Sequence, residues 1–361
     1  MNPRLRRRPP SSTPGPPRVR KLLPLIVLAL VTSGAWDASL QQGSLCQGAP
    51  RFRDCFTLVD SVVLEQPPEH LIAILSGAVL TQDGATVLAD GSEGNLKVYD
   101  GAGRLKKVVG RKGRGPAEFL SLTRPVWGAG GKLYVIDPNL RRLTVFTPTL
   151  ELERTVQIFS PGYYSGVTPL GARGEILLSG VTDEGAAVVV IDSSGREVET
   201  LLPTSRVMRP LTAENEHWRV ITSIETGLIG RNVYVVSTVL DTVWQFNLST
   251  KHVRAFPIPL SELHQDVPGP KTRTLAALQE WFVSFYYPRG VHVSAGRLLV
   301  PVVRGIVTQK AVTILGILNP DTGAWTFIRN APAILASDDR RILALLNPNP
   351  DRLTIGVYRW R

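Results

Sequence analysis

A short motif recurs along this chain of 361 residues and limits its possible folds more than any other feature. In each copy, a glycine and one or two polar residues precede a short apolar run, as in Gly131 followed by Leu133–Asp137. A glycine at this position predicts a hairpin turn with a positive φ angle. The remaining copies of the motif begin at Gly84, Gly174, Gly230, Gly296 and, without the glycine, at Asp339.

A second signal, a polar turn residue, recurs once after each copy of the first motif except the last. After another apolar run comes a polar residue whose side chain can accept hydrogen bonds from nearby backbone amides and so favours a turn. Successive copies start 47, 43, 56, 66 and 43 residues apart. Six units of about 45 residues, each with four short strands, predict an all-β fold, a six-bladed β-propeller of four-stranded blades. The turn residues are Asp100, Thr147, Asp192, Asn247 and Asn319.

The ring needs one strand from the N-terminal side of the repeats to complete it. The last unit, 334–361, supplies three strands, and the strand-like run 56–65 belongs to no other unit. We therefore expect residues 56–65 to form the outer strand of the last blade. This strand would close the ring and remove the exposed edges that an open stack of sheets would present.

The segment 105–147 carries a resemblance to a known family. Its run Gly110-Arg-Lys-Gly-Arg-Gly-Pro-Ala-Glu-Phe119, followed by Lys132-Leu-Tyr-Val-Ile-Asp137, resembles the bacterial six-bladed β-propellers related to NHL repeats. The resemblance is specific here, looser over 70–202 and architectural beyond. It implies the propeller fold; related NHL-type propellers bind proteins, glycans or RNA, and some relatives are metal-dependent lactonases or lyases.

The first 35 residues have the features of an export signal. Seven Arg and Lys residues precede the apolar run 22–31, and Ser33 and Ala35 provide the small residues that signal peptidase requires. The apolar run is shorter than the roughly 20 residues that span a membrane, so an uncleaved anchor is the weaker alternative. We predict a signal peptide at 1–35, an N-terminal extension at 36–55 and the propeller at 56–361. The mature protein would then lie in the periplasm or outside the cell, without a stable membrane span.

Charge and cysteine content agree with export. The basic residues of the signal account for most of the formal charge of +11 and leave about +4, too little to indicate a nucleic-acid partner. Cys46 and Cys55 are the only cysteines and are separated by eight residues, which predicts a disulfide in an oxidising compartment. Lipidation of Cys46 is the alternative, but Leu45 stands where that modification needs a small residue.

The two longest spacings place extra residues at about 203–219 and 259–289. Both insertions would connect the outer strand of one blade to the inner strand of the next, so we expect them on one face, over the central channel. Within the second insertion, apolar residues at helical spacing over 271–286 predict a short helix. Long loops in compact domains are usually functional or disordered, and the composition of the second insertion is not that of a disordered segment.

Arginine and aromatic side chains on this face suit an anionic or sugar-like ligand, because arginine forms forked hydrogen bonds and aromatic rings stack. Trp281, Tyr286 and Tyr287 are expected at the exposed rim. The candidate ligand-binding residues are Arg124, Tyr164, Arg219, Trp281, Tyr287 and Arg289.

Motifs for common catalytic chemistry are missing from the sequence. The run that begins at Gly110 does not fit a dinucleotide fingerprint, because Pro116 and another β unit follow it in place of a helix. A metal-dependent lactonase or lyase is the main enzymatic alternative. The predicted innermost strands offer it only Glu225 and His292 as ionisable ligands, whereas a hard cation prefers several oxygen ligands.

The sequence therefore favours an exported, non-catalytic propeller that binds a ligand or protein on the face with the two insertions. We expect no cofactor and a monomeric protein. Its partner would be an extracellular protein, a glycan or an anionic small molecule; a structural module of a surface assembly is a further alternative.

Overall fold

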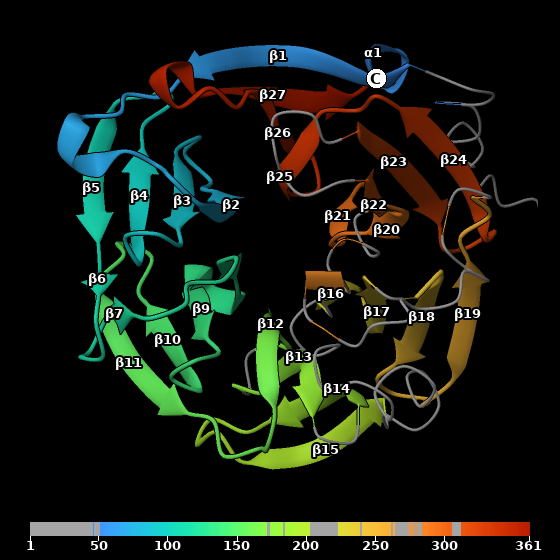
Figure 1. Cartoon of the computed structure of the whole chain (residues 1–361). Helices are drawn as coiled ribbons and strands as arrows, with labels where there is room; N and C mark the ends of the chain where they lie inside the picture. The colour runs from blue at the N-terminus through green and yellow to red at the C-terminus, as the bar shows by residue number, and fades with distance from the viewer. Residues whose placement is uncertain are drawn as a thin grey trace, which may run out of the picture. The chain divides into compact units, whose positions relative to one another are not determined.

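In the computed structural model, antiparallel sheets are arranged as the blades of a six-bladed β-propeller (Figure 1). The chain divides into two units, Met1–Gly43 and Ser44–Arg361, and every described residue belongs to the second. The structure describes residues 46, 51–171, 174–182, 185–202, 223–238, 240–260, 263, 274, 276–277, 280, 284–304 and 312–361. The predicted export signal lies outside these residues, as does most of the predicted helix at 271–286.

The first three blades follow one another along the chain, and each contains four strands in order from the channel outward. Blade 1 contains β2 (Leu75–Leu80), β3 (Thr86–Asp90), β4 (Asn95–Tyr99) and β5 (Leu105–Val109). Blade 2 contains β8 (Val126–Trp127), β9 (Leu133–Asp137), β10 (Arg142–Phe146) and β11 (Leu152–Gln157). Blade 3 contains β12 (Tyr163–Pro169), β13 (Ile176–Thr182), β14 (Gly185–Ile191) and β15 (Glu197–Leu202).

Blade 4 continues this pattern, and blade 5 has a divided inner position. Blade 4 contains β16 (Ile224–Ile229), β17 (Asn232–Ser237), β18 (Thr242–Asn247) and β19 (Val253–Pro257). In blade 5, β20 (Tyr286–Pro288) and β21 (His292–Ser294) both pair with β22 (Arg297–Arg304). Its outer half is β23 (Val312–Asn319) and β24 (Ala324–Arg329).

Blade 6 joins the two ends of the propeller. Its inner strands are β25 (Ala333–Ser337), β26 (Ile342–Asn347) and β27 (Thr354–Trp360). Its outer strand is β1 (Phe56–Val63), which runs antiparallel to β27 with Phe56 opposite Trp360. Figure 1 shows β1 and β27 side by side. The predicted closure of the ring by the N-terminal strand is therefore confirmed.

Apolar clusters between neighbouring blades form the core. Strand β3 illustrates the arrangement: Val87 and Ala89 pack toward blade 2, whereas Leu88 packs toward blade 6. Successive side chains of a strand point to opposite faces, and all five residues of β3 are buried, so both faces of this strand contribute to the core. Each described blade interface contains one such cluster.

The repeat motif forms the turns that the sequence predicts. All five motif glycines have positive φ angles, between 58° at Gly230 and 90° at Gly84. The polar turn residues accept backbone hydrogen bonds: Asp100 from Ala102, and Asp192 from Ser194. Equivalent bonds are made by Thr147, Asn247 and Asn319.

The glycine-rich run after β5 wraps around a carboxylate of the same loop. It contains β6 (Arg111–Lys112), which pairs in parallel with β7 (Glu118–Phe119). The Glu118 carboxylate accepts the Gly115 amide at 2.7 Å and pairs with Arg111 at 2.7 Å. The hydrogen bond from Gly115 is the main reason that the pKa of Glu118 is lowered. The glycine-rich loop is therefore occupied by a carboxylate of its own, which lies against Gly113 and Gly115.

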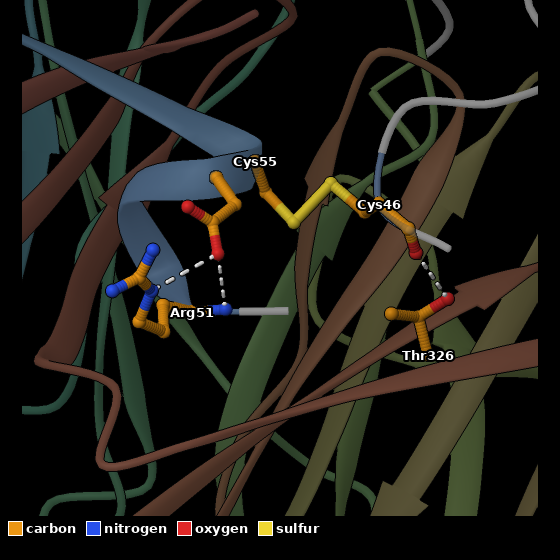
Figure 2. Close-up of a disulfide and its surroundings, with 5 residues drawn as sticks. Cys46, Arg51, Cys55 and Thr326 are labelled. Carbon is orange, nitrogen blue, oxygen red and sulfur yellow. Dashed lines mark hydrogen bonds and ion pairs between the residues drawn. A yellow bond between two sulfur atoms is a disulfide. The ribbon is translucent and has the colours of Figure 1, made fainter. Parts of the chain in front are cut away.

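The predicted disulfide joins Cys46 to Cys55, whose Cα atoms lie 5.3 Å apart (Figure 2). Cys55 ends the single-turn helix α1 (Phe52–Cys55), in which the Asp54 carboxylate accepts the Arg51 amide at 2.8 Å. The carbonyl of Cys46 accepts the Thr326 hydroxyl of β24 at 3.2 Å. The disulfide therefore connects the start of the closing strand to blade 5.

Short 3₁₀ turns occur at Pro68–His70, Ala129–Gly131 and Pro350–Arg352. Among the helices that the structure describes, none is long and apolar enough to cross a membrane.

Candidate functional site

The innermost strands of the blades surround a central channel and include the two that carry Glu225 and His292, as the sequence predicts. These innermost strands are β2, β8, β12, β16, β21 and β25. Glu225 lies on β16 and His292 begins β21. Arg124 lies two residues before β8. These three residues come from blades 2, 4 and 5 and meet inside the channel.

The Arg124 guanidinium joins the other two side chains. Its Nη2 atom lies 3.0 Å from Glu225 Oε2, and its Nη1 atom lies 3.4 Å from His292 Nδ1. Nη1 also donates to the backbone carbonyl of Val291 at 3.1 Å. The Oε2 contact is an ion pair without hydrogen-bond alignment, because this buried atom has no partner of suitable geometry. We call Arg124, Glu225 and His292 the axial cluster.

Two glycines provide the space that the axial cluster needs. A Cβ atom on Gly77 of β2 would lie 2.6 Å from both Cβ and Cγ of Arg124. A Cβ atom on Gly290 would lie 3.2 Å from Glu225 Oε2, and Gly290 also has a φ angle of 90°. Gly77 therefore lets the Arg124 side chain pass blade 1 and reach across the channel.

His292 is neutral at physiological pH. Its residue is 8% exposed, and burial lowers its pKa well below the usual 6.5. The positive charge of Arg124 lowers the pKa further, and a hydrogen bond to the backbone of Ile334 opposes the shift. Because a guanidinium only donates, Nδ1 of His292 must accept from Arg124.

Arg124 lies between two cavities of the channel. We call one of them the upper cavity: its volume is about 290 Å³, and residues at the starts of the inner strands line it. The other, the lower cavity, has a volume of about 310 Å³ and is lined mainly by residues further along the same strands. Ser223, directly before β16, and Arg289, between β20 and β21, both line the upper cavity. We call the end of the channel where Ser223 and Arg289 lie the insertion face; the insertion at 203–219 and most of that at 259–289 lie outside the described residues. The other polar side chains that line the upper cavity are Ser76, Thr123, Arg124, Ser165, Glu225 and Thr226.

The candidate residues named from the sequence have different positions. Arg124 and Arg289 both line the upper cavity. Tyr164 is 2% exposed and its hydroxyl contacts Ser160 at 2.6 Å, within the packing between blades 2 and 3. Tyr287 is 6% exposed, so the expectation that it lies at the exposed rim is wrong: it packs among apolar residues of blades 3 and 4. Arg219 and Trp281 lie outside the described residues.

The sequence suggested Glu225 and His292 as possible metal ligands. The structure brings them together, but the guanidinium of Arg124 lies between them. A divalent cation between them would meet the positive charge of Arg124 within hydrogen-bond distance of both. Within the described part of the chain, no group of three or more His, Cys, Asp and Glu side chains has the arrangement of a metal site.

Sequence reasoning missed Gly77 and the hydroxyl side chains of the upper cavity. Gly77 lies inside a strand instead of at a turn, and a glycine there often marks a close approach by another group. The serines lie at strand starts, where similar residues commonly form turns. Their position around the channel depends on the ring as a whole.

Solved structures with the same architecture include a "putative exported protein" from Bacteroides fragilis NCTC 9343. It shares 12% identity, with a TM-score of 0.58 over 87% of this chain and 98% of that one. A member of the DUF4221 family from Bacteroides vulgatus ATCC 8482 shares 9% identity, with a TM-score of 0.56 over 85% and 98%.

No family model matches the chain, and the comparison with curated proteins finds no match either. At such low identities, the similarity to solved structures shows the fold alone. The resemblance to NHL-type propellers therefore remains a prediction, whereas the six-bladed architecture is shown.

Proposed function

We propose that this chain is an exported binding module that holds a ligand at the upper cavity, on the insertion face. The observation that carries the proposal is the position of Arg124 and Arg289 in one cavity with several hydroxyl side chains. The rigid inner strands fix these groups before a ligand arrives, and such preorganisation favours affinity. The Cys46–Cys55 disulfide supports a location outside the cytoplasm.

The charges of the upper cavity favour an anionic or saccharide ligand. Glu225 offsets the charge of Arg124 through their 3.0 Å contact. Arg289 is exposed at the same cavity and adds a second positive charge. A carboxylate or phosphate group can accept a forked pair of hydrogen bonds from arginine, and the serine and threonine side chains can bond to sugar hydroxyls.

The axial cluster favours binding over metal-dependent hydrolysis or lyase chemistry. In that alternative, Glu225 and His292 would hold a divalent ion in the channel. Here the Arg124 guanidinium already supplies the positive charge between them, at 3.0 and 3.4 Å. A second cation at this position would face like-charge repulsion at short range.

A thermal-shift screen of the protein without residues 1–35 tests the proposal. The probes are sugar acids, sugar phosphates and neutral oligosaccharides, since a ligand that binds only the folded state raises the melting temperature. We expect Arg289→Ala to weaken the best hit by about tenfold, the loss of one charged contact. Arg359→Ala, an exposed arginine of β27, is the matched control and should leave binding unchanged. The proposal is wrong if no probe binds or if Arg289→Ala binds as tightly as the wild type.

A further inference from the structure

The lower cavity has different chemistry from the upper one. Its volume is about 310 Å³, and residues from all blades line it, so it lies on the axis at the end away from the insertion face. Leu228, Pro169, Val293 and Trp127 are half-buried and contribute apolar surface there. The remaining apolar wall residues are Ala78, Val79, Leu80, Pro125, Val126, Val291 and Ala336.

The polar side chains of the lower cavity already have protein partners. The hydroxyls of Thr168 and Thr226 contact each other at 2.8 Å. Ser337 donates to the carbonyl of Val293 at 2.7 Å. The indole nitrogen of Trp127 donates to the carbonyl of Leu80 at 2.8 Å, which fixes the orientation of the ring. These bonds also occupy carbonyl groups of the inner strands.

The charged groups of this cavity are compensated too. Asp338, at its mouth, pairs with Arg341 at 2.7 Å and accepts the Arg341 amide at 2.6 Å. Arg124, at its inner end, pairs with Glu225. His292 is neutral because of its burial. A charged ligand would lose its hydration here without gaining an unpaired opposite charge.

We propose that the lower cavity is a second binding site, for a compact uncharged molecule that combines an apolar ring system with a hydroxyl group. A cavity of about 150 Å³ in another protein is known to hold one benzene ring. The lower cavity has about twice that volume, which suits two fused rings. Its apolar walls cover the rings, and the hydroxyl oxygens of Thr168, Thr226 and Ser337 can each accept a hydrogen bond from the ligand's hydroxyl beside the bond they already make.

This site shares Arg124, Val126 and Thr226 with the upper cavity, but the two sites can be tested separately. Arg124 and its partners lie between the two cavities, and Arg289 lines only the upper one. Arg289→Ala should therefore leave lower-site binding unchanged. Failure of one proposal can then be distinguished from failure of the other.

Calorimetric titration of the wild-type protein without residues 1–35 with 2-naphthol tests the proposal. We expect saturable 1:1 binding with a Kd of roughly 10 to 100 µM, which is reasonable for a ligand of this size. The anion 2-naphthoate has the same rings and should bind at least about tenfold more weakly, because its charge finds no partner. Absence of saturable 2-naphthol binding, or tighter binding of 2-naphthoate, would overturn the proposal.

A cavity-filling variant locates the site. Val293→Phe adds a ring inside the lower cavity and should lower 2-naphthol affinity at least tenfold. Val198→Phe makes the same change at a residue of β15 that is 56% exposed, and should not affect binding. Equal binding by Val293→Phe and wild type contradicts the assignment. If Val293→Phe does not fold, quenching of Trp127 fluorescence by 2-naphthol, lost in Trp127→Phe, supplies the same test in a folded protein.

Discussion

At the residue scale, the axial cluster determines the character of the channel. Arg124 and Glu225 have side chains that are 24% and 26% exposed, and their charges meet at 3.0 Å. Water screens such a pair less than a surface pair, so the loss of one partner leaves a poorly solvated charge. His292 accepts from the same guanidinium and remains neutral.

Glu225→Gln should therefore lower the free energy of unfolding by about 1–3 kcal/mol, a value reduced from that of a fully buried pair because of the partial exposure. The matched control is Glu153→Gln, which breaks the more exposed pair with Lys132 and should cost less than about 0.5 kcal/mol. Urea unfolding at pH 7 measures both variants. Equal losses would show that the axial pair is no stronger than a surface pair.

Stability should also depend on His292 below neutral pH. Its folded pKa lies well below 6.5, so below pH 6.5 the unfolded chain binds a proton that the folded protein does not. The free energy of unfolding should then fall by up to about 1.4 kcal/mol per pH unit as the pH decreases. His292→Gln removes this contribution, so its stability should change less between pH 6.5 and 5. Identical pH slopes in urea unfolding would contradict the prediction.

At the element scale, the turns between strands impose the repeat. The hairpin between β21 and β22 has positive φ angles at both Ala295 and Gly296, 49° and 69°. Two residues of this conformation join antiparallel strands with the correct twist. The sequence signal is therefore local: a glycine marks the turn because other residues are strained in this region.

Gly296→Ala should destabilise the protein by about 1–2 kcal/mol, the cost of the left-handed conformation for a residue with a Cβ atom. The control is Gly101→Ala. A Cβ atom meets nothing within 4 Å at either position, but only Gly296 has a positive φ angle. Thermal unfolding of both variants separates strain from packing. A loss at Gly101 as large as that at Gly296 would contradict the explanation.

At the scale of the whole molecule, the ring is closed by residues from opposite ends of the described chain. Strand β1 covers β27, and its first residue, Phe56, packs with Trp360 at a ring-centroid distance of 4.6 Å. The Cys46–Cys55 disulfide restrains the segment directly before this strand. Closure protects an edge that could otherwise pair with another chain.

Cys46→Ser/Cys55→Ser should lower the free energy of unfolding by about 2–3 kcal/mol, because the crosslink restricts the unfolded chain. Urea unfolding with and without a thiol reductant measures the effect. The reductant should destabilise the wild type by a similar amount and leave the double variant unchanged. If the disulfide of the wild type is reduced and its free energy of unfolding does not change, β1 stays paired with β27 without the crosslink and the prediction is wrong.

The sequence by itself determined the number of blades, the order of their strands, the closing strand and the disulfide. The blades follow from short apolar runs, turn glycines and the spacing between them, the closing strand from the three strands of the last unit, and the disulfide from the only two cysteines. Only the tertiary structure showed that Arg124 contacts Glu225 and His292 and that Tyr164 and Tyr287 are buried. Arg124 and His292 are 168 residues apart, and their meeting depends on the radius of the ring and on the space left by Gly77. No periodicity of the chain encodes that distance, because it arises only when all blades have closed around the channel.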